Sequence, residues 1–320
     1  MGKKEFSLSP IIPGAGLSIA LAVAALGLSE LNPAFNPAII SLLLGMFTAN
    51  FIEKKDHVFG PGARFCYRFV LPAAVGLSGS QLVFTGGAAL LWPYSAGCGL
   101  LVFGITFLVA RGFGLEDDLS VLLSTGLSTL GPGAVAMTSD ASGSDSQDTS
   151  AAVIAVITIG MAGMLVMGFY PQGLGLGTEK LAFLIGVTLP DLTLVKAAGL
   201  PEGALRLAGS FVLLKSVLLG AVLLRVFFSR RRTPRSGARF PWFMVLFIIL
   251  ALAVGLLPEG HRISAFVSPA GRFAAAAGLA ATGLCVDFDS APAKGLMPFA
   301  AAVFSWGISI FFIYLVVKTL

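Results

Sequence analysis

The sequence predicts an all-α integral membrane protein with about eleven transmembrane helices, internal repeats that are partly inverted, and two helices that are discontinuous at mid-membrane. Three observations predict this class. Of the 320 residues, 56% are hydrophobic and only 12% are charged. The mean hydropathy is +0.92, so the apolar residues exceed what one soluble core could bury. Finally, two of the long apolar runs contain Gly and Pro near their centres.

The apolar runs define the expected spans, because one bilayer crossing needs about 20 residues. Short loops join them, so we expect residues 1–320 to form a single polytopic domain. The eleven expected spans are 11–28, 38–51, 65–84, 88–110, 119–139, 151–170, 181–198, 203–228, 242–257, 265–288 and 296–317.

The positive charges predict the orientation of these spans. Lys54 and Lys55, Arg111 and the basic loop 229–240 lie in alternate loops, whereas the loop 140–148 carries no basic residue. By the positive-inside rule the basic loops are cytoplasmic. We therefore expect a multi-pass protein of the cell (inner) membrane with a cytoplasmic N-terminus and an exterior C-terminus. The net charge of +5 then reflects topology, and no nucleic-acid partner is expected.

The residue types used by most enzymes and metal sites are scarce. Cys66, Cys98 and Cys285 lie in or beside apolar runs without paired spacing, so no disulfide framework or zinc site is indicated. The two histidines, His57 and His261, fall in loops expected on opposite sides of the membrane. We therefore expect no cofactor, no metal and no enzymatic activity.

The first interrupted span contains Gly131, Pro132 and Gly133. Irregular backbone at membrane depth is stable only inside protein or beside a water-filled cavity. Pro132 suits the first turn of a second half-helix, whose exposed N–H groups would attract an anion. The alternative is a proline kink that neighbouring helices accommodate. The groups expected to bind an anion here are Ser128, Thr129, Gly131, Gly133 and Ala134.

The second interrupted span, 181–198, repeats this pattern. Gly186, Thr188 and Pro190 echo Gly126, Ser128 and Pro132 at nearly constant offset, and paired interrupted spans indicate the binding site of a transporter. This adds Thr188 to the expected site.

A second internal echo relates residues 75–93 to residues 282–298, seven crossings later, which would invert them. The two interrupted spans are instead two crossings apart and would run parallel. Either the repeat is permuted, or one interrupted span does not fully cross, or the echo is due to chance.

Two charged residues lie within apolar runs. Asp191 follows Pro190, and a charge near the bilayer centre costs on the order of 3 kcal/mol, so it either takes up and releases a proton or caps the following half-helix. Lys215 lies in the middle of the run 203–228 and either binds an anion or neutralises Asp191. Arg206 is close enough to the start of that run to reach the interface.

Two motifs resemble a family of bacterial membrane proteins catalogued as sulfate exporters of the YeiH type. GLSTLGPGAVAM (126–137) resembles that family's Gly-Thr-Ser-Ile-Cys-Gly-Ala-Ser-Ala-Ile-Ala-Ala signature, and GVTLPDLTLVKAAG (186–199) is similar to its Gly-Ala-Ser-Ile-His-Glu-Val-Ala-Gln-Val-Val-Ala-Ala-Gly. Order and spacing match over most of the chain. Ser128, Gly131 and Asp191 carry over by position. Leu130 replaces the Cys, Pro132-Gly133 replaces Ala-Ser, and Pro190 replaces the His, so any role of that imidazole is lost.

The resemblance implies a fold related to the bile-acid and proton-antiporter superfamily, and from it alone we expect a homodimer. Together with the residues it predicts a secondary active transporter of a small anion, sulfate or a related oxyanion or sulfonate, in which Asp191 couples transport to a proton. The alternative is a sodium-coupled carrier of organic anions. An enzyme that uses Asp191, or a structural subunit of a membrane complex, is a more distant alternative.

Overall fold

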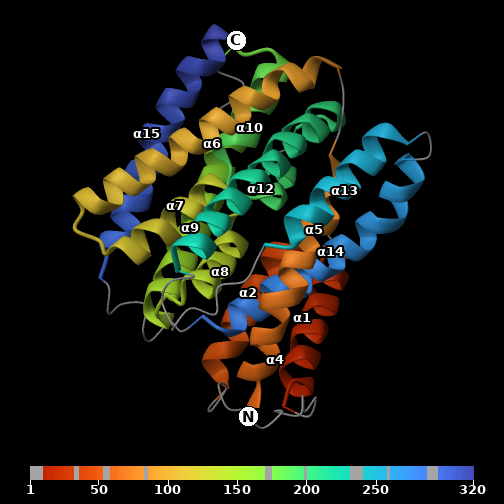
Figure 1. Cartoon of the computed structure of the whole chain (residues 1–320), viewed down its shortest axis with the longest axis vertical. Helices are drawn as coiled ribbons and strands as arrows, with labels where there is room; N and C mark the ends of the chain where they lie inside the picture. Colours follow the sequence, from red (N-terminus) through yellow and green to blue (C-terminus); the bar gives the residue numbers. More distant parts are fainter. Residues whose placement is uncertain are drawn as a thin grey trace.

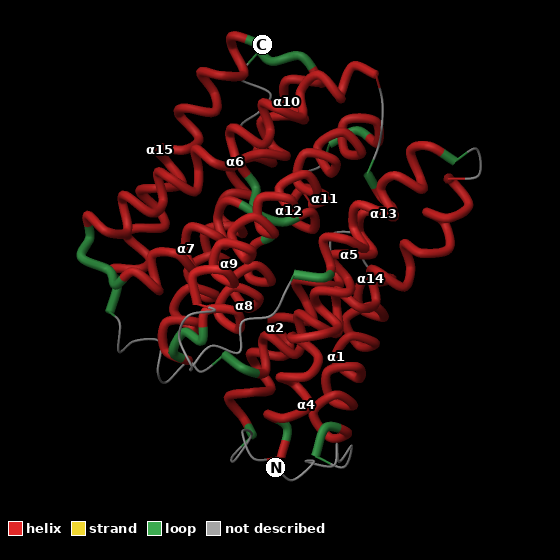
Figure 2. The backbone as a smooth tube through the Cα atoms, in the orientation of Figure 1, coloured by secondary structure: helices red, strands yellow, loops and turns green. Residues whose placement is uncertain are grey.

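A computed structural model describes residues 10–31, 36–52, 58–82, 86–169, 175–197, 200–230, 241–257, 260–286 and 295–320. Every regular element in these ranges is helical (Figure 2), which confirms the all-α prediction. Helix α1 begins at the lower end of the molecule in Figure 1, and α15 ends at the upper end. The start of α1 and the end of α15 therefore lie at opposite ends of the molecule.

The helices form two packed groups that occupy different parts of Figure 1. The lower group, here named the α14 unit, is held together by contacts of α14 with α1, α2 and α5. Its elements are α1 (Ile12–Leu31), α2 (Pro37–Phe51), α4 (Gly60–Phe65), the π-helical turn η1 (Cys66–Val70), α5 (Leu71–Ser78), the 3₁₀ turn η2 (Gly79–Gln81), α13 (Phe243–Leu256) and α14 (Gly260–Leu284).

The upper group, here named the α12 unit, contains both interrupted segments. Contacts of α6 with α7 and α15, and of α10 with α12, connect it, and Phe183 on α10 meets Phe211 on α12 edge to face at 4.9 Å. Its elements are α6 (Gly86–Gly112), α7 (Asp117–Ser128), α8 (Gly131–Ser142), α9 (Ser146–Phe169), α10 (Thr178–Thr188), α11 (Leu192–Ala197), α12 (Glu202–Arg230) and α15 (Met297–Thr319).

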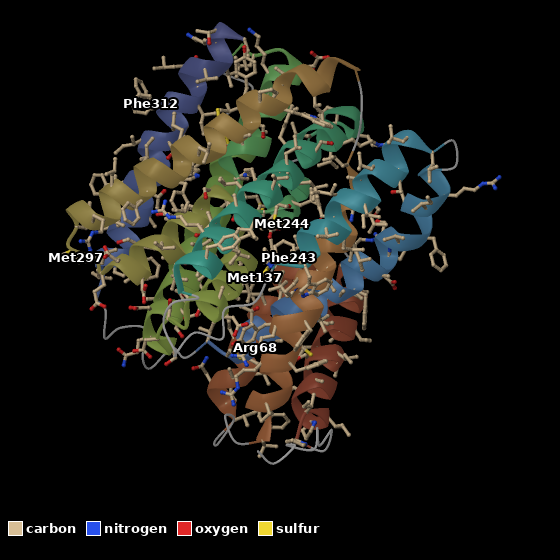
Figure 3. The ribbon with its side chains drawn as sticks, viewed as in Figure 1. Arg68, Met137, Phe243, Met244, Met297 and Phe312 are labelled. Carbon is tan, nitrogen blue, oxygen red and sulfur yellow. The ribbon has the colours of Figure 1, made fainter. Side chains whose placement is uncertain are left out.

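Several helices have the length and composition of membrane spans. Among the described residues, α1, α9, α12, α14, α15 and the Leu91–Gly112 part of α6 are long and apolar enough to cross a bilayer, and α2 and α13 are shorter apolar helices. Large exposed apolar side chains suit contact with lipid. Phe304 is 59% exposed, and Phe312, labelled in Figure 3, is 45% exposed. The other predicted spans correspond to the helical stretch 60–81 and to the two interrupted segments.

Glycines bring helix backbones into direct contact within the α14 unit. A Cβ on Gly45 of α2 would lie 2.3 Å from the carbonyl oxygen of Ala280, and one on Gly283 of α14 would lie 2.3 Å from that of Leu42. No larger side chain fits at such distances, so glycine on both helices allows the close approach that stabilises membrane helix pairs.

The chain reverses direction at the first break, between α7 and α8. A Cβ on Gly126 of α7 would lie 2.6 Å from a methyl carbon of Val135 on α8, although a continuous helix would separate these positions by about 13 Å. The prediction that 119–139 crosses as one interrupted rod is therefore wrong for its second half. The physical reason is burial: folding back packs Ala134 and Val135, both 0% exposed, against neighbouring helices.

This reversal also corrects the predicted position of the loop 140–148. The loop was expected at the end opposite to the basic loop near Lys54, yet Ser144 and Ser146 line the same cavity as Phe59 and Gly60. The reversal favours one of the three explanations for the parallel orientation of the interrupted spans, the one in which a span does not fully cross.

The second segment also changes direction. Gly186 of α10 lies against Ala208 of α12, and Leu192 of α11 lies against the adjacent Gly209, whereas a straight helix would separate residues 186 and 192 by about 9 Å. Figure 2 shows α11 beside α12.

Several predictions concern residues outside the described ranges. They are Lys54, Lys55 and His57, residues 231–240 of the basic loop, and residues 83–85 and 287–294 within the two segments that echo each other. Which face of the membrane each end of the molecule occupies stays a prediction.

Candidate functional site

The first break is a short non-helical turn that ends in a left-handed glycine. Helix α7 ends at Ser128, Thr129 has φ −125° and ψ −102°, and Gly131 begins α8 with φ +64°. A side chain with a Cβ is strained in that region, so glycine suits the position. Pro132 lies in the first turn of α8, where its missing N–H leaves no donor unsatisfied.

The amino end of α8 has no side-chain cap. Leu130 occupies the capping position and makes no capping hydrogen bond. The first-turn N–H groups of a helix need partners and attract negative charge. Leu130 and Gly133 both line a cavity, so this helix end faces open space.

The second break is capped at its carbonyl end by a buried lysine. Lys215 of α12 is 1% exposed, and its Nζ donates hydrogen bonds to the carbonyl oxygens of Val187 at 3.2 Å and of Leu189 at 2.7 Å. These carbonyls belong to the end of α10, where a positive charge is stabilised by the helix dipole. Lys215 also interacts electrostatically with Asp191. The structure therefore places Lys215 beside Asp191, as one of its two predicted roles, the neutralisation of Asp191, requires. It also adds a third role, the capping of α10.

The two breaks meet. A Cβ on Gly131 would lie 3.5 Å from the Cβ of Asp191 and 3.6 Å from the carbonyl oxygen of Pro190. Two segments that are about 60 positions apart in the chain thus bring the amino end of α8 and the carboxyl group of Asp191 together.

A cavity of about 350 Å³ lies beside this meeting point, between the two units. The α12 unit contributes Leu130, Gly133, Asp191, Leu192 and Leu213. The α14 unit contributes residues of α1, α2, α5, η2 and α14, which include Gln81 of η2 and Arg272 of α14. We name it the upper cavity. It contains one cationic and one anionic side chain, and its volume suits a small organic molecule.

A second cavity of about 390 Å³, the lower cavity, lies toward the other end of the boundary between the units. Arg64, Tyr67, Ser139 and Thr149 are among its lining residues, and none of the described break residues lines it. Gly133 lies against Leu71 and Leu279, and all three residues line the upper cavity. The break residues Leu130, Gly133 and Asp191 thus line the upper cavity and not the lower one.

An ion pair joins the units beside the lower cavity. The Nε of Arg68 on η1 lies 2.5 Å from Oδ1 of Asp140 on α8. Figure 3 shows Arg68, Met137 and Phe243 where the two units meet, and all three line a smaller cavity of about 120 Å³ there.

The structure brings the predicted site residues together, though they do not share one role. Thr129 and Thr188 are buried, and their hydroxyls donate to Thr125 and Leu184 carbonyls of their own helices at 2.5 and 2.7 Å. The hydroxyl of Ser128, 1% exposed, has no hydrogen-bond partner among the described residues. The predicted site residues that lie at or next to the breaks are Ser128, Thr129, Gly131, Gly133, Ala134, Thr188 and Asp191, with Lys215 packed behind them.

Sequence reasoning missed Arg272 and Gln81, which line the upper cavity. Arg272 begins a run rich in alanine and glycine, and small residues of this kind indicate close helix packing. A usable signal was present, because a charged residue within an apolar span is itself a candidate functional residue.

This arrangement defines a class: a multi-pass, all-helical protein of the cell membrane with two interrupted segments that meet at a cavity. The chain belongs to the family described as Conserved hypothetical protein 698, whose model matches residues 13–302. This confirms that the chain is related to YeiH-type proteins.

Named relatives extend over nearly the whole chain. The UPF0324 inner membrane protein YeiH of Escherichia coli is 26% identical over 337 residues, 95% of this chain and 93% of that protein. The UPF0324 membrane protein WS2204 of Wolinella succinogenes is 25% identical, covering 96% of this chain and 97% of that protein. Atu0671 of Agrobacterium fabrum is 27% identical, with 88% and 86% covered. None of these names gives a substrate, and no solved structure matches the chain.

Proposed function

We propose that this protein is a secondary active transporter of a small anion that works by alternating access. One arrangement supports this above all: two interrupted segments meet at Gly131 and Asp191 beside a cavity between two helical units. Carriers use interrupted helices to present backbone groups to a substrate within the membrane. In this proposal the interrupted segments are corresponding parts of inverted repeats, and the carrier is a homodimer and not an enzyme.

Three groups support an anion as the substrate. The uncapped amino end of α8 faces the upper cavity at Gly133, Arg272 lines the same cavity, and the hydroxyl of Ser128 is available near the break. Sulfate and sulfonates both fall in this class. Thr129, Thr188 and Lys215 would hold the breaks in shape, since their donors already bind helix carbonyls.

The two cavities support alternating access. The α12 unit would move against the α14 unit so that the breaks open first to the upper cavity and then to the lower one. In this proposal the ion pair between Arg68 and Asp140, which joins the two units, would hold the lower side closed.

Asp191 would couple this movement to a proton. Asp191 lines the cavity in which the anion would bind, and its ionised carboxylate would repel the anion. Protonation of Asp191 and anion binding would therefore favour each other. Because such coupling is reciprocal, the proton and the anion would move in the same direction.

Flux measurements in proteoliposomes test the proposal. The protein should transport candidate anions, and a lower pH outside the vesicles than inside should drive anion uptake. Asp191→Asn should abolish the dependence of uptake on the pH gradient. The control is Glu179→Gln, which replaces an exposed acid in the first turn of α10 and should keep that dependence. If no anion moves under any gradient, the carrier proposal is wrong.

A sodium-coupled carrier is the second candidate. The acceptor lone pairs of Thr129 and Thr188 lie at the breaks, and hydroxyl and carbonyl oxygens bind sodium in carriers. Flux that rises with sodium at fixed pH would favour this candidate over proton coupling.

A further inference from the structure

We propose that the substrate of this carrier is an organic monoanion with an apolar body, a carboxylate or a sulfonate, and not inorganic sulfate. The inference rests on the proposed function and concerns the upper cavity. It comes from the composition of the cavity wall, from the hydrogen bonds that the wall residues already make, and from the two charged side chains among the lining residues.

Most of the wall is apolar and comes from both units. Leu26, Leu71, Val75 and Leu279 contribute from the α14 unit, and Leu192 and Leu213 contribute from the α12 unit. A cavity of about 350 Å³ is at the lower end of the usual size for small organic ligands, which bind mainly apolar walls with a few polar groups for orientation. Sulfate would fill a small part of this volume and would contact apolar carbon on most sides.

The polar groups of the wall offer few donors. The hydroxyl of Ser29 donates to the carbonyl oxygen of Leu26 at 2.6 Å, and that of Ser78 donates to the carbonyl oxygen of Val75 at 2.7 Å. Each hydroxyl has a single proton, so in these geometries both serines present only acceptor lone pairs to a ligand.

Asn36 is also partly used, because its side-chain oxygen accepts from the backbone N–H of Ala38 at 3.1 Å. The side-chain donors of the wall are then the guanidinium of Arg272 and the amide NH2 groups of Gln81 and Asn36, together with the amino end of α8. A divalent oxyanion that leaves water needs donors on all sides, since an unsatisfied buried charge is strongly unfavourable. A monoanion needs donors only around its charged head.

The charges of the cavity match one negative charge. Arg272 and Asp191 are the charged side chains that line it, so protonation of Asp191 leaves a single positive charge. Lys215 lies behind Asp191, and two helix carbonyls already accept hydrogen bonds from its ammonium group. A monoanion with its charged head at Arg272 and its body against the apolar wall that includes Leu71 and Leu279 satisfies both the charge and the wall.

The test is a thermal-shift series on the purified full-length chain at constant ionic strength. The probes are sulfate, methanesulfonate, propanesulfonate, pentanesulfonate and benzenesulfonate, with propanol and pentanol as uncharged controls. A ligand that binds the folded state raises its stability. We expect binding about four-fold tighter for each added methylene until the cavity is filled, no shift with the alcohols, and little shift with sulfate.

Substitutions at two wall residues connect the result to this cavity. Arg272→Gln should weaken every sulfonate, and Arg272→Lys should recover part of the loss. Val75→Thr keeps the shape of a wall residue but adds a hydroxyl, so it should reduce the gain per methylene while leaving methanesulfonate unchanged. Val23→Thr is the matched control, because Val23 is on α1, 56% exposed, and does not line the cavity.

Three outcomes would overturn the inference, and they differ in what they leave standing. If sulfate binds most tightly and apolar length adds nothing, the substrate class is wrong while the carrier proposal stands. If no anion binds and none moves in proteoliposomes, the carrier proposal falls and this inference falls with it. A gain per methylene that Val75→Thr and Arg272→Gln both leave unchanged would also overturn it, since binding would then occur elsewhere.

Discussion

Replacing Gly131 by alanine tests the reversal between α7 and α8. Gly131 has φ +64°, a conformation in which an L residue with a Cβ is less stable than glycine by roughly 1–2 kcal/mol. Space is not the obstacle, because the nearest atoms to an added Cβ, on Asp191 and Pro190, lie 3.5 to 3.6 Å away. We therefore expect Gly131→Ala to lower the free energy of unfolding by about 1–2 kcal/mol, from backbone strain alone.

Gly133→Ala is the matched control, two positions later in the same helix turn. Gly133 is not left-handed, and an added Cβ would meet Leu71 at 3.6 Å, an ordinary contact. Alanine is favoured over glycine inside a helix by roughly 0.5–1 kcal/mol, so this variant should be neutral or more stable. The two alanine variants should thus change stability in opposite directions.

The assay is unfolding of the purified protein in mixed micelles with a rising fraction of sodium dodecyl sulfate, followed by circular dichroism. Equal effects of the two substitutions would refute the reasoning. They would mean that Gly131 is not left-handed and that the chain does not turn there, and the meeting of the two breaks would lose its support.

Three further predictions concern the charged groups. Lys215→Met should destabilise the protein by roughly 2–6 kcal/mol in the same unfolding assay, because two buried carbonyls lose their donor at about 1–3 kcal/mol each; an unchanged midpoint would show that the ammonium does not cap α10. Anion affinity should rise as pH falls, by on the order of 50-fold if the two charges are about 7 Å apart at an effective dielectric constant of about 20. Asp191→Asn should remove this pH dependence; equal pH profiles for both proteins would contradict the shared cavity. Arg68→Gln should remove the ion pair with Asp140 between the units and increase the reaction of an introduced lower-cavity cysteine with a thiol reagent. Arg111→Gln, whose ion pair joins two helices of one unit, should not increase it.

The positions of the breaks could be predicted from the sequence, because glycine and proline act locally. Gly131 and Pro132 end one helix and begin another, and Pro190 ends α10, as their backbone preferences require. The direction of the chain after Gly131 could not be predicted. A Gly-Pro-Gly sequence permits either a kink or a reversal, and the contact of Val135 with Gly126 decides between them.

The candidate site could be predicted only in part, for a similar reason. Asp191 and Lys215 were evident because a charge in an apolar span needs a partner. The carbonyls that Lys215 contacts belong to another segment, and which segments face each other depends on tertiary packing. Arg272 was missed because its helix comes from a distant part of the chain and meets the breaks only across the boundary between the units.

The glycine contacts between α2 and α14 have a consequence for motion. At Gly45 and Gly283 a backbone lies directly against a carbonyl oxygen of the opposite helix, so no side chain there could rearrange to let the two helices slide past each other. If the protein works by the proposed alternating access, we therefore expect the movement at the boundary between the units and not between α2 and α14. A covalent cross-link between α2 and α14 should then leave transport unchanged, whereas a cross-link between the α12 unit and the α14 unit should abolish it.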